Sequence, residues 1–248
     1  MMDGIELLRE IVETSDRIVA FTGAGLSAES GIPTYRGAGG LWTKYDPNIY
    51  ANIEHFMVDP TYYWNFFQEV RYPIISKAKP NAAHDALVEL ERRKLLKTVI
   101  TQNIDGLHQM AGSRNVIELH GNTRNIACMD CGKEHSMDEV YEKLPAELPP
   151  KCECGGGLKP KVVFFGESLP FEALEGANDA VKDCDACIVV GSSLVVYPAA
   201  MLPVLAAQNG ARLAIINIDP TPLDHMAEVV INESAADVLH TVVKGGFE

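Results

Sequence analysis

Hydrophobic and polar positions along the chain form patterns that predict helices and strands in turn. Between Ile5 and Val12 the apolar residues recur at helical spacing, which predicts an amphipathic helix over residues 4–15. Comparable segments predict helices over residues 81–93, 173–183 and 235–243. Short apolar runs predict buried strands at residues 17–21, 99–101, 116–119, 162–167, 186–190, 213–219 and 229–231. Strands that alternate with helices are typical of an α/β fold with a parallel sheet.

One stretch departs from this alternation. Residues 48–77 are rich in aromatic side chains, such as Tyr63, Trp64 and Phe67. Aromatic residues at helical spacing more often fill a core than bind a cofactor. The stretch therefore predicts a small helical insertion that packs on the main domain.

Composition and charge exclude some classes of function. The 248 residues are 47% hydrophobic, enough for a sizeable core, and the formal net charge is −13. A protein that relied on phosphate contacts to nucleic acid would carry the opposite charge, so no direct nucleic-acid binding is expected. No apolar run reaches about 18 residues, so no membrane span is expected. The six cysteines and the acidic N-terminal segment favour a reducing, cytoplasmic location with metal-bound or buried thiols.

A glycine-rich turn follows the first predicted strand. Gly23, Gly25 and Ala28 match the G-x-G-x-x-G/A pattern between a predicted strand and a predicted helix. Such glycines let backbone N–H groups approach a pyrophosphate. No acidic residue ends a clean second strand about 20 residues later, as an ordinary dehydrogenase would require. Instead a second glycine-rich loop carries Arg36, which suits a diphosphate.

Polar side chains gather where predicted strands end. Gln102, Asn103 and Asp105 follow the strand at 99–101, and three such residues exceed what a helix cap needs. Two further strands end in small or polar residues, at 191–193 and at 217–219. The carboxyl ends of parallel strands are where ligands bind, so these residues predict a polar ligand site.

A histidine ends another short apolar strand. His120 follows residues 116–119 and precedes Gly121. An imidazole can act as a general base near neutral pH, although a single histidine at a strand end is often structural. His84 and His108 are interpreted as structural.

Four of the six cysteines form two close pairs, which are Cys128, Cys131, Cys152 and Cys154. Two such pairs about twenty residues apart predict a structural zinc site with four thiolate ligands. A shell filled by four protein ligands leaves no open position for catalysis. Cys184 and Cys187 adjoin an apolar strand and are predicted to be buried, inert thiols.

These motifs together resemble the sirtuin family of NAD-dependent protein-lysine deacylases, in its compact prokaryotic form. The resemblance runs through the whole chain in order, on residues 23–27, 31–33, 36–37, 101–105, 120–122, 164–167 and 191–194 and on the four paired cysteines. It implies an α/β architecture in which residues 1–36, 80–122 and 158–248 form a Rossmann-like NAD-binding domain. The helical insertion, residues 37–79, and the zinc-binding module, residues 123–157, would form an inserted smaller domain.

The resemblance also implies roles for individual residues. His120 would be the general base and Asn103 a second catalytic residue. The implied NAD-binding residues are Gly23, Ala24, Gly25, Ala28, Tyr35, Arg36, Gln102, Ile104, Asp105, Gly191, Ser192, Ser193, Asn217, Asp219, Ala235 and Asp237. The implied peptide-binding residues are Val163, Phe165, Gly166, Glu167, Val195 and Val196.

The reaction that the resemblance implies consumes NAD. The substrate amide oxygen attacks the nicotinamide ribose, nicotinamide leaves, and His120 activates a ribose hydroxyl, which gives free lysine and O-acyl-ADP-ribose. The partners would be acetylated protein lysines, and the protein would be a monomer. Two alternatives remain open, which are mono-ADP-ribosyl transfer and a non-catalytic NAD sensor that uses the same cleft.

Two departures from family patterns matter. Tyr35 stands where the family usually has Phe. Phe67 and Val70 occupy the positions where members that remove succinyl or malonyl groups carry a Tyr and an Arg, and Arg71 lies one position away. The departure predicts a preference for uncharged acyl groups, acetyl first.

Overall fold

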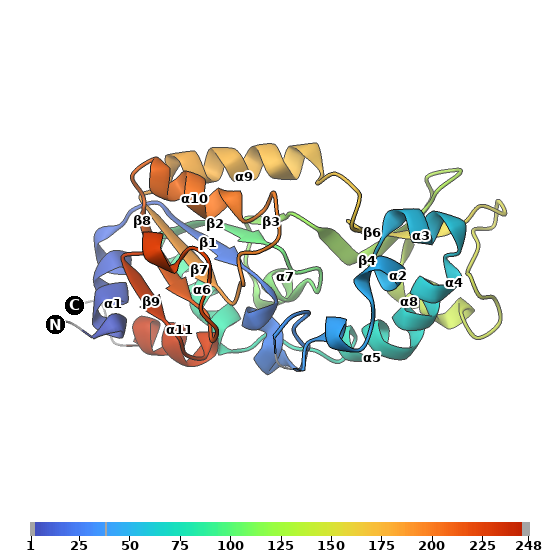
Figure 1. The fold of residues 1–248 in the computed structure, drawn as a ribbon, viewed down its shortest axis with the longest axis horizontal. Helices are drawn as coiled ribbons and strands as arrows, with labels where there is room; N and C mark the ends of the chain where they lie inside the picture. Colours follow the sequence, from blue (N-terminus) through green and yellow to red (C-terminus); the bar gives the residue numbers. More distant parts are fainter. Residues whose placement is uncertain (1–2, 38, 245–248) are drawn as a thin grey trace.

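A six-stranded parallel sheet forms the larger part of this computed structural model, which describes residues 3–37 and 39–244 (Figure 1). The strand order is β3-β2-β1-β7-β8-β9. The bounds are β1 Ile18–Thr22, β2 Leu96–Thr101, β3 Val116–Glu118, β7 Ala186–Val190, β8 Arg212–Ile216 and β9 Val229–Ile231. The order reverses between β1 and β7, and this reversal is the place where α/β sheets bind ligands.

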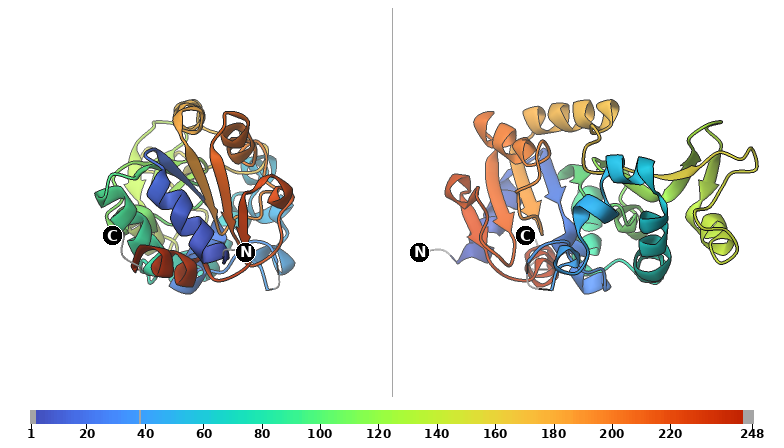
Figure 2. Two further views of the ribbon diagram at one scale, coloured as in Figure 1. Left: turned by 90° about the vertical axis from the view of Figure 1, so that its left-hand side faces the viewer. Right: turned by 45° about the vertical axis from the view of Figure 1, so that its right-hand side comes forward.

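Helices cover both faces of this sheet. The first face packs against α1 (Gly4–Thr14), α6 (Ala82–Arg92) and α11 (Ala235–Lys244). The second packs against α9 (Phe171–Asp183) and α10 (Met201–Gln208) (Figure 2). Side chains alternate along β1, so that Ala20 joins the first core and Phe21 the second. The predicted α/β fold with a parallel sheet is confirmed.

A second sheet lies to one side of the first (Figure 1). It is antiparallel, in the order β5-β4-β6, with β4 Gly121–Cys128, β5 Glu134–Ser136 and β6 Leu158–Val162. Around it lie α2 Pro47–Tyr50, α3 Ile53–Val58, α4 Thr61–Phe66, α5 Tyr72–Ile75 and α8 Met137–Lys143, and a short α7 Leu107–Ala111 follows β2. Among the described residues, 3₁₀ segments cover Ala24–Ser30, Leu41–Thr43 and Asp224–Met226, and a π-helical turn covers Phe67–Arg71.

The helical insertion and the cysteine-containing sheet share one hydrophobic core. Trp64 and Phe67 from the insertion pack with Ile126 of β4 and Leu158 of β6. The aromatic residues of the insertion therefore fill a core, as predicted. That core, however, belongs to the second sheet.

The strand predicted at 162–167 is wrong in position and in partner. The strand is β6, Leu158–Val162, and it pairs antiparallel with β4. Residues 158–162 thus lie in the second sheet, although the sequence analysis placed them in the Rossmann-like domain. Pro160 fits there because β6 is an edge strand, where a missing N–H removes no ladder hydrogen bond.

Within residues 3–37 and 39–244, no helix combines the length and the apolar character that crossing a bilayer requires.

Candidate functional site

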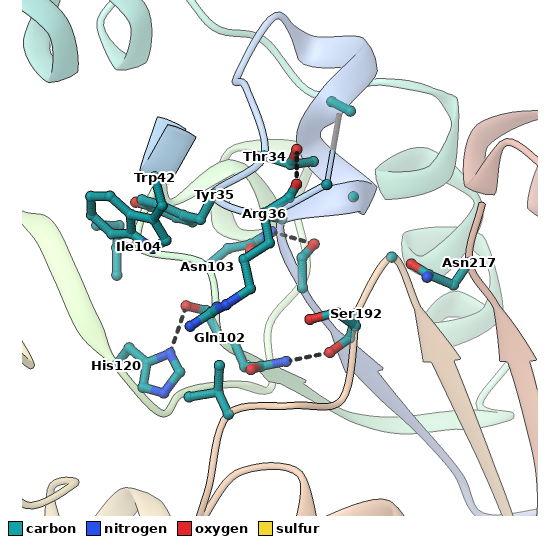
Figure 3. Close-up of a pocket in the computed structure, with 18 of the residues that line it drawn as sticks. Thr34, Tyr35, Arg36, Trp42, Gln102, Asn103, Ile104, His120, Ser192 and Asn217 are labelled. Carbon is teal, nitrogen blue, oxygen red and sulfur yellow. Dashed lines mark hydrogen bonds between the residues drawn. The ribbon is translucent and has the colours of Figure 1, made fainter. Parts of the chain in front are cut away.

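A cavity of about 530 Å³ opens at the carboxyl ends of the parallel strands. Gly23 follows β1, Gln102 follows β2, Gly191 follows β7 and Asn217 follows β8, and all four line it. Figure 3 labels Gln102 and Asn217 among the lining residues. The second sheet and the helical insertion contribute the opposite wall. The cavity therefore joins the two parts of the molecule at the point where the strand order reverses.

The glycine-rich turn packs closely against the loop after β7. The Gly25 N–H donates to the Gly191 carbonyl at 2.8 Å. A Cβ on Gly25 would lie 2.8 Å from the Gly191 Cα, so glycine is required for this approach. Gly191 has a φ of +63°, which also favours glycine. The predicted helix after the turn is a 3₁₀ segment, Ala24–Ser30.

The polar cluster after β2 is tied to these two loops. The Gln102 amide donates to the Ser192 hydroxyl at 2.8 Å, and the Asn103 amide donates to the Gly23 carbonyl at 3.1 Å. Asp105 accepts from the Ser27 hydroxyl at 2.8 Å. Burial raises the pKa of Asp105. The cluster holds the loops after β1, β2 and β7 in one arrangement.

His120 lies between β3 and β4, where the first sheet passes into the second. Its Nδ1 lies 3.1 Å from the Gln102 carbonyl (Figure 3). A carbonyl oxygen can only accept, so Nδ1 carries the proton and Nε2 has the free lone pair. Burial lowers the pKa of His120, with the Gln102 bond opposing. The imidazole is therefore neutral near pH 7 and can accept a proton.

The loop between the glycine-rich turn and α2 contributes Tyr35, Arg36 and Trp42 to the cavity wall. The Arg36 side chain extends toward Gln102 and His120 (Figure 3), and partial burial lowers its pKa. The Tyr35 ring contacts the Trp42 ring at 5.0 Å between centroids. Trp42 in turn contacts Phe165 at 6.5 Å. The loop thus reaches across the cavity from the first sheet to the segment after β6.

The segment after β6 forms the other side of the cavity. The Val163 N–H donates to the His120 carbonyl at 2.9 Å, and the Phe165 N–H donates to the Ala51 carbonyl at 2.8 Å. The Glu167 carboxylate accepts from the Phe164 N–H at 2.8 Å. Backbone pairing on both sides fixes this segment beside His120.

Most of the predicted site residues meet in this one cavity. Those that line it are Gly23, Ala24, Gly25, Ala28, Tyr35, Arg36, Gln102, Asn103, Ile104, His120, Val163, Phe165, Gly166, Glu167, Gly191, Ser192, Ser193, Val196, Asn217, Asp219 and Ala235.

Asp105, Val195 and Asp237 are not among the lining residues. Asp105 is buried and bonds to Ser27, behind the cavity wall. Val195 is exposed, and Asp237 lies two helical positions after Ala235, on a different face of α11.

Other lining residues were not predicted to belong to the site. They include Glu29, Thr34, Trp42, Ala51, Arg71, Tyr197, Glu233 and Ser234. Trp42 ends the glycine-rich loop, and this position was a signal from which its place in the cavity wall could have been predicted. Arg71, a cation within an aromatic segment, was another.

The four paired cysteines also meet. Their sulfur atoms all lie within 4.8 Å of one another, with Cys128 Sγ 3.5 Å from Cys154 Sγ and Cys131 Sγ 3.8 Å from Cys152 Sγ. Tetrahedral zinc with bonds of about 2.3 Å places its sulfur ligands about 3.8 Å apart. The cluster therefore fits a structural zinc ion. Cys184 and Cys187 lie elsewhere and are buried, as predicted.

Two buried histidines pack against each other near the end of β1. His84 and His108 are 0% and 1% exposed, with ring centroids 5.0 Å apart. His84 completes the cap of α6 with Asn81, and His108 Nε2 lies 2.9 Å from the Thr22 hydroxyl. Burial lowers the pKa of His84 to about 4 and that of His108 to about 3. Both are structural and neutral.

These depressed pKa values predict acid sensitivity. Above the ordinary histidine pKa of 6.5, both imidazoles are neutral in the folded and in the unfolded chain, so they take nothing from the stability. Below pH 6.5 these histidines bind protons in the unfolded chain but not in the folded one. The free energy of unfolding therefore falls until the pH reaches the pKa values of the folded protein. The loss is about 1.4 kcal/mol per pKa unit and residue. Urea unfolding at pH 7 and pH 5 measures it. His108→Asn should weaken the pH dependence and His225→Asn, at an exposed position, should not; equal slopes would contradict the assignment.

The fold and the cavity define a doubly wound nucleotide-binding protein with an inserted cysteine-ligand module. A sequence profile described as the Sir2 family matches residues 23–198. An NAD-dependent protein deacetylase of Sulfurisphaera tokodaii is 48% identical over 235 residues, 94% of this chain and 92% of that one. An NAD-dependent protein deacylase 2 of Archaeoglobus fulgidus is 48% identical over 98% of this chain and 96% of its own. This chain therefore belongs to the Sir2 family.

The solved structures agree. A Sir2 variant with a deacetylated p53 peptide and 3′-O-acetyl ADP ribose superimposes with a TM-score of 0.94, at 40% identity, over 98% of both chains. The predicted sirtuin membership is confirmed.

Proposed function

We propose that this chain removes acetyl groups from protein lysine side chains, with NAD as co-substrate, and forms nicotinamide and O-acetyl-ADP-ribose. The observation that carries the proposal is His120, whose Nδ1 is committed to the Gln102 carbonyl while the imidazole faces the cavity. Family membership and the names of the relatives support the same activity.

The cofactor residues are assigned by their place along the cavity. The turn at 23–28 and Arg36 bind the diphosphate, and residues 102–105 bind the nicotinamide end, with Asp105 acting from behind the wall. The adenosine end is bound by Gly191, Ser192, Ser193, Asn217, Asp219, Ala235 and Asp237. The close approach of Gly25 to Gly191 supports a backbone cradle for the diphosphate. NAD supplies the ribose hydroxyl that accepts the acyl group.

The substrate peptide pairs with residues 163–167 and 195–196 as an added strand. Phe165 and His120 flank the acyl-lysine, and Tyr35 shields the reacting ribose. Asn103 orients the nicotinamide end through its bonds to Gly23 and Ser27. Orientation and exclusion of water are what these residues contribute.

His120 carries the proton chemistry. Its Nε2 accepts a proton from the ribose hydroxyl and later returns it to the departing lysine amine. Its lowered pKa keeps the base neutral at physiological pH.

Incubation with NAD and acetylated peptides tests the proposal. Mass spectrometry should find O-acetyl-ADP-ribose in amounts equal to free lysine peptide. ADP-ribosylated peptide with the acetyl group retained would favour mono-ADP-ribosyl transfer. NAD binding without any turnover would favour a sensor.

We also propose that the protein is a monomer, that it lies in the cytoplasm and that it does not bind nucleic acid directly. The net charge of −13 supports the last point. Light scattering across a concentration series should give the mass of one chain.

A further inference from the structure

Lys159 is a largely buried cation on β6, next to the segment that forms one side of the cavity. Its side chain is 18% exposed, whereas that of Lys161, two positions later on the same strand, is 45% exposed. Lys159 is not among the residues that line the described cavity, and no role was predicted for it from the sequence. A lysine seldom loses its contact with water unless other groups compensate its charge and bind its N–H donors.

Oxygen acceptors from the segment around and after Lys159 surround its ammonium group. The Nζ atom lies 3.0 Å from the Glu167 carboxylate, and it donates to the Val162 carbonyl at 3.1 Å and to the Pro160 carbonyl at 3.4 Å. An ammonium group has three N–H donors, and one carboxylate and two carbonyls can accept from all of them. The same Nζ lies 4.6 Å from the centroid of the Phe164 ring, which adds a cation–π contact.

The carboxylate that Lys159 contacts also closes a turn over residues 164–167. The same Glu167 oxygen accepts from the Phe164 N–H at 2.8 Å, and the Glu167 N–H donates to the Phe164 carbonyl at 3.0 Å. Gly166, inside this turn, has a φ of +90°, which favours glycine. Lys159 therefore fixes the side chain that joins the two ends of the turn.

The turn decides which backbone groups face a ligand. The Val163 and Phe165 N–H groups donate to carbonyls outside the segment. Successive N–H groups of an extended chain point in opposite directions, and the Phe164 N–H is taken by the Glu167 carboxylate. Among the described hydrogen bonds none uses the N–H of Gly166, which is exposed and lines the cavity. This group is free to bind an extended peptide.

We propose that Lys159 is a positioning residue for the acylated peptide, because it holds Glu167 so that the turn at 164–167 presents the Gly166 edge to the peptide. The inference rests on the proposed function, which assigns residues 163–167 to the peptide. Lys159 acts through Glu167 and the Val162 carbonyl, and it takes no part in the transfer of the acyl group or of protons.

Lys159→Met tests the proposal, because methionine keeps much of the apolar stem and removes the charge and the donors. The peptide Kd is measured by fluorescence anisotropy with a labelled acetyl-lysine peptide, and KM and kcat from O-acetyl-ADP-ribose formation at saturating NAD. The peptide Kd and KM should rise about tenfold, the scale of a hydrogen bond to a charged group. The Kd for NAD and kcat should stay nearly unchanged, because His120 and the turn at 23–28 keep their contacts.

Two further substitutions serve as controls. Lys161→Met removes a lysine from the same strand, one that pairs with Glu134, and should leave the peptide KM unchanged. Lys159→Arg keeps the charge and a donor for Glu167, so it should restore most of the peptide affinity.

A double-mutant cycle shows whether Lys159 acts through Glu167. In a Glu167→Gln background, Lys159→Met should raise the peptide KM much less than it does in the wild type, because the two residues form one unit. Fully additive effects would mean that Lys159 acts by another route.

The outcomes separate this proposal from the proposed function. An unchanged peptide Kd in Lys159→Met overturns the positioning role, and so does an equal rise in the Kd for NAD, which would reflect general damage to the fold. If Lys159→Met does not fold, Lys159→Gln removes the charge but keeps a polar head, and a peptide KM equal to that of the wild type would contradict the proposal. No turnover of acetylated peptide by the wild type overturns the proposed function, whereas the anisotropy measurement still decides the role of Lys159.

Discussion

His120→Ala is expected to reduce deacetylation by about 10²–10⁴-fold, the usual contribution of a positioned general base. The imidazole lines the cavity, and its orientation is set by the bond from Nδ1 to the Gln102 carbonyl. No other histidine is among the lining residues of the described cavity, so no neighbour can take over the proton transfer. The measurement is the steady-state rate of O-acetyl-ADP-ribose formation.

NAD affinity separates a catalytic role from a structural one. His120→Ala removes a base and leaves the turn at 23–28 and Arg36 in place, so the Kd for NAD should change little. His225→Ala, at an exposed histidine outside the cavity, is the control and should keep the wild-type rate. If His120→Ala kept more than a tenth of the activity, the assignment of the base would be wrong.

The pH profile gives a second check on the same residue. Because burial lowers the pKa of His120, the acid limb of kcat/KM should have its midpoint below the ordinary value of 6.5. A midpoint above 6.5 would mean that another group controls the reaction.

Loss of zinc is expected to remove stability and activity together. Cys128 and Cys152 are part of the hydrophobic core that also contains Trp64 of the helical insertion and Val162 of β6. Zinc binding by small thiolate modules contributes on the order of 10 kcal/mol to folding. Without the ion the second sheet should lose its order, and with it the segment after β6 that pairs with the His120 carbonyl.

Cys131→Ser tests this directly. Cys131 is exposed, so the substitution removes a ligand with little effect on packing. Zinc content, melting temperature and deacetylation rate should all fall. Cys184→Ser changes a buried thiol outside the cluster and should keep the full zinc content. Full activity after stoichiometric loss of zinc would contradict a structural role for the metal.

The parallel sheet could be predicted because its strands are short apolar runs that end in glycine or polar residues. Residues 186–190 and 229–231 were predicted with the bounds that the structure gives. The strand Leu158–Val162 was missed because its two lysines interrupt the apolar residues. Their alternation with buried side chains fits the antiparallel sheet that the strand joins. Pro160 within the strand was a sign of an edge strand.

The site could be predicted where its residues follow the ends of strands, and less well where they lie in the helical insertion. Gln102, Gly191 and Asn217 meet because parallel strands bring their carboxyl ends to one edge. Arg71 was noted only for its place beside the positions Phe67 and Val70, and its place in the cavity wall was not predicted.

Trp42 contacts Tyr35 in the loop assigned to NAD and Phe165 in the segment assigned to the peptide. An interaction that orders the Trp42 indole therefore affects the binding of both substrates. Binding free energies are linked reciprocally, so if NAD orders Trp42, it strengthens peptide binding by the same factor that the peptide strengthens NAD binding. One side chain between two loops thus gives the enzyme a basis for cooperative binding of its two substrates.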